Sequence, residues 1–149
     1  MAIWHDSFPI ELVRQQSQNT LISLLGIEII EAGDEYLKGR MPVDERTYRP
    51  ARMLHGGASA VLAETLASWG ALYVVDRARY HCVGLEINAN HVRAVASGFL
   101  LGVARPLHLG RSTQIWDVRI TDEQDRLVCV SRVTMAVLKT ESRASNERG

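Results

Sequence analysis

The first candidate for chemistry is Glu64, a single carboxylate inside a long apolar stretch. Over the twenty residues from 56 to 75, Glu64 is the only side chain that is ionised near neutral pH. A carboxylate removed from water is costly unless it is paired, protonated or part of a functional site. Ser68 comes one helical turn later, within reach of the carboxylate or a bound water. The pattern favours Glu64 as general base or nucleophile, with a salt bridge or subunit contact as the structural alternative.

The second candidate is the sequence His-Gly-Gly at residues 55 to 57, where the apolar stretch begins. Glycines let a ligand approach the backbone, and the first amides of a helix have no intrahelical partner. These amides and the helix dipole are suited to a developing oxyanion. An ordinary helix start would explain the same residues, but Glu64 follows His55 by nine residues, and the combination is more specific.

Further candidates lie near the ends of predicted strands. Counting alternate residues from Leu85 places His91 on an apolar strand face, either as an interior group or as a catalyst. Arg93 and Arg111 are either surface arginines or phosphate contacts, and His108 precedes a predicted turn. The sequence has no cluster with metal-ligand spacing, no serine-nucleophile elbow and no phosphate loop. We therefore expect neither a bound metal nor a serine triad.

The stretch that carries Glu64 is predicted to be one buried helix over residues 56–75. Its length and hydrophobicity would also suit a membrane span, but the central carboxylate and the many small residues argue against that. A helix that is apolar on nearly all sides is buried on nearly all sides. The small residues that would let a sheet approach closely are Ala58, Ala60, Ala63, Ala67, Gly70 and Ala71.

The rest of the chain alternates in the way that strands do. Two strands are predicted at residues 27–31 and 36–41, on either side of a turn at Gly33-Asp34. Period-two patterns predict four more, at residues 82–90, 97–105, 112–121 and 127–138. A short helix is predicted over 8–18, a short helical or irregular piece over 21–25, a long loop over 42–53 and a turn over 122–125. Since no helix separates the later strands, we expect an α+β fold with a mainly antiparallel sheet around one helix.

Composition limits the class of protein. The chain has 149 residues, 46% of them hydrophobic, and a formal net charge of zero. We expect one domain over 1–138, followed by a polar tail over 139–149. The balanced charge gives no reason to expect nucleic acid or a membrane surface as a partner. Without an apolar leader, and with Cys82 and Cys129 expected to be free thiols that pack as small hydrophobes, a cytoplasmic location is predicted.

Several motifs together resemble one family. They are Met-Pro-Val-Asp at 41–44, Leu-His-Gly-Gly-Ala-Ser-Ala at 54–60, Leu-Ala-Glu-Thr-Leu at 62–66, Gly-Leu-Glu-Ile-Asn-Ala-Asn-His-Val-Arg at 84–93 and Pro-Leu-His-Leu-Gly-Arg at 106–111. From residue 18 to 138 the chain is similar to the hotdog-fold acyl-CoA thioesterases of the hydroxybenzoyl-CoA and dihydroxynaphthoyl-CoA thioesterase type. The resemblance implies a long central helix wrapped by a curved antiparallel sheet of about six strands. It also implies a homodimer or homotetramer with active sites at the dimer interface.

The resemblance assigns roles to particular residues. Glu64 would be the nucleophile or general base, the Gly56 amide would polarise the thioester carbonyl, and Ser68 would hold the water or intermediate. His55 and His91 match histidines near the thioester. The substrate would be an acyl-CoA, and no cofactor is implied beyond the CoA of the substrate. Positions that match the lining of the CoA and substrate site are Gly84, His91, Val92, Arg93, Ala94, His108, Leu109, Gly110, Arg111, Ser112 and Thr113.

The sequence departs from the family pattern at two positions. Arg49 stands where the family usually has glutamine, and Ala94 stands where proline often follows Arg93. Arg49 belongs to the predicted catalytic set, and three roles are open to it. It could pair with Glu64 across the interface, bind an anionic group of the substrate, or reach a CoA phosphate. The second departure affects only the rigidity of a loop.

The predicted function is therefore hydrolysis of an aromatic or medium-chain acyl-CoA. Trp69, Tyr73 and Met53 could shape the acyl pocket or could belong to the core. One alternative is a hotdog hydratase or dehydratase that acts on acyl thioesters. Another is a non-catalytic acyl-CoA-binding module in which Arg49 has silenced the site.

Overall fold

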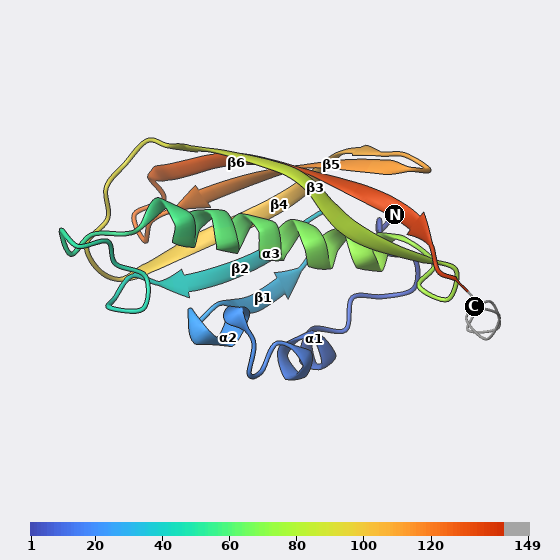
Figure 1. Ribbon diagram of the computed structural model, residues 1–149, viewed down its shortest axis with the longest axis horizontal. Helices are drawn as coiled ribbons and strands as arrows, with labels where there is room; N and C mark the ends of the chain where they lie inside the picture. Colours follow the sequence, from blue (N-terminus) through green and yellow to red (C-terminus); the bar gives the residue numbers. More distant parts are fainter. Residues whose placement is uncertain (142–149) are drawn as a thin grey trace, which may run out of the picture.

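The computed structural model describes residues 1–141, and its central feature is one long helix inside a curved sheet (Figure 1). The helices are α1 (Ile10–Gln16), α2 (Leu21–Leu24) and α3 (Gly56–Val74). The strands are β1 (Glu28–Ala32), β2 (Leu37–Pro42), β3 (Tyr80–His91), β4 (Phe99–Leu109), β5 (Thr113–Thr121) and β6 (Leu127–Lys139). Lys139 ends β6, and residues 142–149 of the predicted tail lie outside the described residues.

The six strands form one antiparallel sheet in the order β1-β2-β4-β5-β6-β3. The sheet curves around α3, and α1 and α2 lie on the side of the helix away from β6 (Figure 1). The α+β class, the central helix and the antiparallel pairing are confirmed. The predicted turn at 122–125 is also present, because Asp122 Oδ1 accepts hydrogen bonds from the backbone N–H groups of Gln124 and Arg126.

Two β-bulges change what the alternating pattern predicted. The predicted strand 97–105 was placed too early, since β4 starts at Phe99 and continues past Pro106 to Leu109. The register with β5 shifts between Pro106 and His108, which accommodates a proline that has no N–H to donate to the ladder. The predicted strand ended at residue 105 because Pro106 interrupts the sequence pattern that indicates a strand.

A second bulge lies in β3, where the register with β6 shifts between Gly84 and Glu86. The extra residue is Leu85, which is 61% exposed. Ile87 and Ala89 after the bulge are partly buried against the core. The prediction that Leu85 shares their inward face was therefore wrong, because one inserted residue inverts the alternation.

Small residues in the sheet hold α3 in place. Gly39 of β2 and Gly102 of β4 are paired directly across the sheet. A Cβ on Gly39 would lie 2.8 Å from Leu66 Cδ2, and one on Gly102 would lie 2.7 Å from Leu66 Cδ1. The fully buried Leu66 side chain thus occupies space that two side chains would otherwise fill. This close approach fixes the helix, and with it Glu64, relative to the strands.

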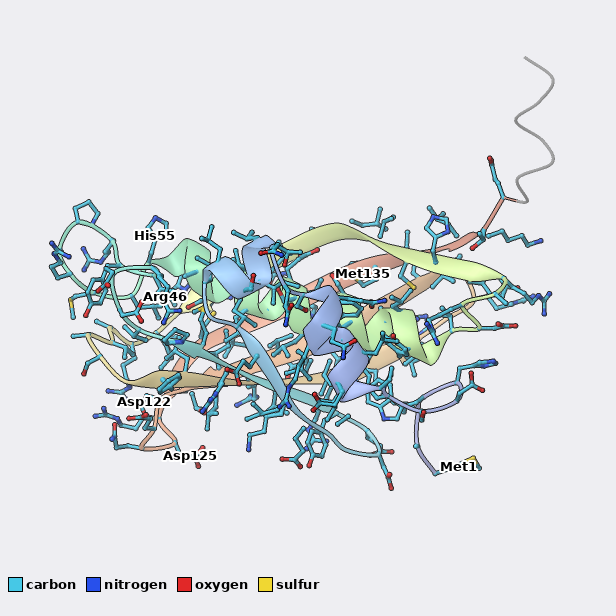
Figure 2. All side chains as sticks on the ribbon, turned by 90° about the horizontal axis from the view of Figure 1, so that it is seen from below. Met1, Arg46, His55, Asp122, Asp125 and Met135 are labelled. Atoms are coloured by element: carbon cyan, nitrogen blue, oxygen red, sulfur yellow. The ribbon has the colours of Figure 1, made fainter. Side chains whose placement is uncertain are left out.

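The two ends of α3 lie at opposite ends of the molecule. His55 lies at the N-terminal end of α3, at the same end as Asp122 and Asp125 of the β5–β6 turn (Figure 2). At the other end, the Phe8 ring packs at a tilt against Tyr73, with ring centroids 5.0 Å apart, and so connects the N-terminal segment to the helix. No helix within residues 1–141 is long and apolar enough to cross a membrane.

Candidate active site

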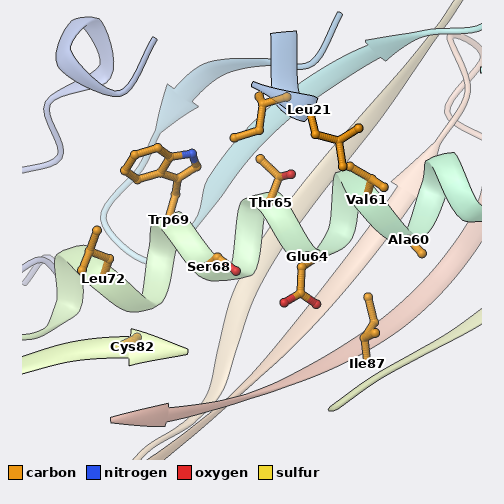
Figure 3. A pocket seen from close by; sticks show the side chains of 11 residues that line it. Leu21, Ala60, Val61, Glu64, Thr65, Ser68, Trp69, Leu72, Cys82 and Ile87 are labelled. Atoms are coloured by element: carbon orange, nitrogen blue, oxygen red, sulfur yellow. The ribbon is translucent and has the colours of Figure 1, made fainter. Parts of the chain in front are cut away.

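Glu64 lies near the middle of α3, on the edge of a cavity of about 540 Å³. Its carboxylate and the Ser68 hydroxyl point from the helix towards β3, whereas Leu21 of α2 approaches from the opposite side (Figure 3). The cavity is a groove along the helix, and its lining is otherwise mostly apolar. The other residues that line it are Ile22, Ala60, Val61, Thr65, Trp69, Leu72, Cys82 and Ile87.

The Glu64 carboxylate is half-buried, and within residues 1–141 it has no salt bridge or hydrogen bond. Burial raises the pKa of Glu64 above its ordinary value, because it disfavours the charged form. Gly84 of β3 lies directly over this carboxylate, so that a Cβ at position 84 would collide with Oε1. The structure therefore brings together three of the predicted site residues: Glu64, Ser68 and Gly84.

The N-terminal end of α3 holds a second group of predicted residues. The Nδ1 atom of His55 accepts a hydrogen bond of 2.8 Å from the Gly57 N–H, and the His55 carbonyl accepts one of 3.0 Å from Ala58. An accepting Nδ1 means that a neutral His55 carries its proton on Nε2. The Gly56 N–H has no hydrogen-bond partner in the described part of the chain. It is the free donor of this helix start.

His91 lies against Gly56. A Cβ on Gly56 would be 2.8 Å from His91 Nε2. Both residues line a cavity of about 400 Å³ together with Arg49, Met53, Leu54, Val92, Arg93 and Ala94. Five predicted site residues from two segments, Gly56 and 91–94, thus meet here, and Arg49 joins them. Met53 lies in this cavity and not beside Glu64.

Within one protomer the two groups remain apart. Gly56 and Glu64 are eight residues apart on the same helix, a rise of about 12 Å. They line different cavities. One carbonyl group cannot contact both the Gly56 N–H and the Glu64 carboxylate of the same chain.

The third group, residues 108–113, lies at the opposite end of the molecule from His91. Gly110, Arg111 and Ser112 line a cavity of about 520 Å³ with Val75, Asp76, Tyr80, Val137 and Lys139. His108 and Leu109 are exposed at the end of β4, and Thr113 begins β5. One protomer therefore does not join this group to residues 91–94.

The sequence prediction missed most of the groove beside Glu64. Ala60, Glu64, Ser68 and Leu72 follow one another at intervals of four residues, and this stripe could have been read as one helix face. The contributions of α2 and β3 could not, because they depend on tertiary packing. Tyr73, one of the suggested pocket residues, is 3% exposed and belongs to the core.

Cys82 lines the groove as a neutral thiol, since burial raises its pKa to about 11. Within residues 1–141 no three His, Cys, Asp or Glu side chains are grouped so that they could hold a metal ion. The groove therefore presents one carboxylate and the hydroxyl-bearing residues Thr65 and Ser68 against an otherwise mostly apolar wall. Such a site can bind an apolar group and place a base or nucleophile at its edge.

Known proteins resemble this chain in sequence and in overall fold. Residues 52–129 match the family model described as "Thioesterase superfamily". The proofreading thioesterase EntH of Cronobacter turicensis is 48% identical over 136 residues, which cover 91% of this chain and 98% of EntH.

Solved structures agree with the sequence match. A thioesterase of Pseudomonas aeruginosa, crystallised with a glutamine at its position 49 replaced by alanine, superposes with a TM-score of 0.92. It is 44% identical and covers 93% of this chain and 100% of its own. A thioesterase of Haemophilus influenzae superposes with a TM-score of 0.91 at 40% identity, covering 95% of this chain and 98% of its own. This chain therefore belongs to the thioesterase superfamily, as a thioester hydrolase with the hotdog fold.

Proposed function

We propose that this protein hydrolyses an aromatic or medium-chain acyl-CoA to the free acid and CoA, with Glu64 as nucleophile or general base. One observation carries the proposal. An unpaired, half-buried carboxylate lies at the edge of an apolar groove of about 540 Å³. That volume lies within the usual range for sites that bind small molecules. The groove would hold the acyl group and leave the thioester carbon beside Glu64.

The reaction requires attack on the thioester carbon and departure of the CoA thiolate. As a general base, Glu64 would take a proton from water while the water oxygen forms the new C–O bond and the C–S bond breaks. As a nucleophile, its Oε would form a mixed anhydride that water then hydrolyses. Ser68, one turn further along the helix, would hold the water or the intermediate. No metal or further cofactor is needed in either route, because a thioester is already activated towards attack.

The carbonyl oxygen needs a donor, and the Gly56 N–H is the free one. Its distance of about 12 Å from Glu64 along the helix implies that the donor comes from a second copy of the chain. The edge strand β3 offers the means, since within residues 1–141 it pairs only with β6 and exposes Val83 and Leu85 at 41% and 61%. Two copies joined antiparallel through β3 would form a homodimer, and two dimers would form a homotetramer.

The register of this pairing follows from the two glycine contacts. Gly84 covers Glu64, and His91 covers Gly56. Pairing Gly84 with His91 of the partner subunit places the twofold axis between Ile87 and Asn88 and brings the partner's Gly56 to Glu64. It also sets the Tyr80 end of β3 beside the partner's residues 91–94. The two predicted CoA-binding segments, 91–94 and 108–113, would then lie along one path.

The first test is thiol release from a panel of aromatic and aliphatic acyl-CoAs. Wild type should release CoA, and Glu64→Ala should reduce release by orders of magnitude. Glu123→Ala, which removes an exposed carboxylate from the β5–β6 turn, is the matched control. Hydration of an enoyl-CoA without thiol release would point to a hydratase, and tight binding without turnover to a binding module. Near-normal turnover in Glu64→Ala would remove Glu64 from the mechanism.

The oxyanion donor is tested by Gly56→Pro. Proline has no N–H but is favoured at the first position of a helix, and the extended backbone of His55 suits a following proline. Gly56→Ala is the matched control, because it keeps the N–H and brings the same Cβ towards His91. We expect Gly56→Pro to lose about a hundredfold or more in kcat relative to Gly56→Ala.

Mixing two inactive variants tests the shared site. Glu64→Ala and Gly56→Pro, unfolded and refolded together, would form heterodimers with one intact site each. Random association would restore about a quarter of the wild-type sites, because half of the dimers are mixed and each has one of two sites intact. A mixture that stays inactive while mixed dimers form would show that both groups act from the same chain.

A further inference from the structure

Resting on the proposed function, we infer that Arg49 selects acyl-CoA substrates that carry a carboxylate close to the thioester. Arg49 and Arg93 line the cavity of about 400 Å³ that also contains Gly56 and His91. No Asp or Glu is among the described residues that line it. Two guanidinium groups in one cavity without a carboxylate form a site for an anion.

Arg49 is held in position by its backbone. Its N–H donates to the Met53 carbonyl at 2.8 Å, and its carbonyl accepts from the Arg52 N–H at 2.9 Å. Tyr48 and Leu54 form an antiparallel bridge at the base of this loop, and the Tyr48 hydroxyl donates to the Ala96 carbonyl at 2.8 Å. A well-anchored loop therefore presents the Arg49 side chain to the cavity.

Within residues 1–141, the guanidinium groups of Arg49 and Arg93 form no ion pair. The one side-chain hydrogen bond of Arg49 within residues 1–141 is a long one of 3.7 Å that Nη2 donates to Met53 Sδ. Neither Arg49 nor Arg93 forms a salt bridge in that part of the chain, whereas Arg46 in the same loop is paired with Asp44 at 2.7 Å. The donors of Arg49 and Arg93 are thus available to a ligand.

The position of the cavity indicates where the anion lies in the substrate. The Gly56 N–H, the proposed donor to the thioester carbonyl, lies in the same cavity as Arg49. An anion that Arg49 binds would therefore lie in the same cavity as that carbonyl. The phosphates of CoA are separated from the sulfur by the whole pantetheine arm, so they do not fit this requirement. A carboxylate on the acyl group does, as in the monothioester of a dicarboxylic acid.

Matched pairs of thioesters test this inference. Glutaryl-CoA and pentanoyl-CoA differ by a carboxylate in place of a terminal methyl group, and methylmalonyl-CoA and isobutyryl-CoA differ in the same way nearer the thioester. With uncatalysed hydrolysis subtracted, wild type should favour the anionic member of at least one pair in kcat/KM. Arg49→Gln should reduce that preference about tenfold or more, the usual size of a charge-assisted hydrogen bond. Arg49→Lys should retain part of it.

Arg52→Gln is the matched control, since Arg52 is an exposed arginine of the same loop that does not line the cavity. Three outcomes would overturn the inference. An equal loss on both members of each pair would mean that Arg49 acts on the carbonyl or on Glu64. An equal change in Arg52→Gln would mean that the overall positive charge of the loop, and not a contact of Arg49, causes the preference for the anionic substrate. A loss confined to CoA thioesters and absent from the matching N-acetylcysteamine thioesters would mean that the bound anion is a CoA phosphate.

Binding separates this inference from the proposed function. Calorimetry on Glu64→Ala should show tighter binding of glutaryl-CoA than of pentanoyl-CoA, and the additional Arg49→Gln change should remove the difference. If wild type releases no thiol from any substrate, the proposed function fails, yet this binding preference would still hold. If wild type is an active thioesterase but Glu64→Ala binds the two members of each pair equally, the inference about the carboxylate fails alone.

Discussion

Gly84 of β3 lies directly over the Glu64 carboxylate of α3, with no room between them for a Cβ atom. The strand thereby fixes the position of the one charged group in an otherwise apolar groove. Because Gly84 does not have a positive φ, its small size and not its backbone freedom is what the site requires. The contact links the edge strand to the proposed chemistry.

Gly84→Ala should therefore impair catalysis and leave the fold intact. The added methyl group would displace the carboxylate, and a misplacement of about 1 Å can cost a hundredfold in rate. We expect kcat/KM for the best acyl-CoA to fall by that order and the Tm to change little. Glu123→Ala, at an exposed position of the β5–β6 turn outside β3, should behave as wild type. Wild-type turnover in Gly84→Ala would mean that the Glu64 carboxylate can change its position without a loss of catalytic rate.

The pH dependence of the rate should follow Glu64. Burial raises the pKa of this carboxyl group, and both proposed roles require its ionised form. Activity should rise with pH through a pKa above the ordinary carboxyl range and level off once Glu64 is ionised. The pH profile of kcat/KM measures this pKa. A midpoint at or below the ordinary pKa of a glutamate would contradict the predicted shift.

The same shift predicts a cost in stability. Since the folded-state pKa of Glu64 is raised above its unfolded value, its stabilising contribution is complete below the unfolded pKa and is lost as the pH rises through the folded pKa. Glu64→Gln should therefore have a higher Tm than wild type at pH 7.5 and an equal one near pH 4. A lower Tm at pH 7.5 would show that the ionised carboxylate gains a partner in the assembled protein.

The order of helices and strands could be predicted from the sequence. In two strands, however, the sequence did not show which residues face the core beyond a bulge. The buried helix was predicted over residues 56–75 and observed as Gly56–Val74, because small and apolar residues mark it. The bulges at Leu85 and Leu107 escaped detection, since an extra residue in a strand has no local pattern of its own.

Likewise, only part of the candidate site could be predicted from the sequence. Glu64 stood out as a lone charge, and the glycines at 56 and 57 as a helix start. Leu21 and Ile22 could not be connected to them, because α2 reaches the groove through tertiary packing alone. The separation of Gly56 from Glu64 followed from the predicted helix over residues 56–75, and it is confirmed because α3 is continuous from Gly56 to Val74.

The length of the groove should determine the preferred acyl group. Leu72 lies two helical turns beyond Glu64, about 12 Å along the axis, and lines the far part of the cavity. Leu72→Trp should reduce kcat/KM for longer acyl chains about tenfold and spare short ones, as occupation of an apolar pocket usually does. Leu24→Trp is the control, since Leu24 is 67% exposed on α2 and does not line the groove. An equal effect on all chain lengths would place the acyl group elsewhere.

The packing of α3 on the sheet predicts that a glycine-to-alanine substitution in this helix destabilises the protein, although such a substitution normally stabilises a helix. Replacing a glycine within a helix by alanine normally stabilises a protein by about 0.5–1 kcal/mol. At Gly70, however, the new Cβ would lie 2.8 Å from Cη2 of Trp116, a fully buried ring. Overpacking of this kind costs about 1–3 kcal/mol, so Gly70→Ala should lower the free energy of unfolding.

A double-variant cycle, measured by denaturant unfolding, isolates the cause of that loss. Trp116→Leu alone should destabilise the protein by leaving a cavity. In the Trp116→Leu background, Gly70→Ala should become neutral or stabilising, because the ring that opposed the methyl group is gone and the ordinary helix preference returns. If Gly70→Ala costs the same in both backgrounds, the helix backbone at position 70, and not its contact with Trp116, requires glycine.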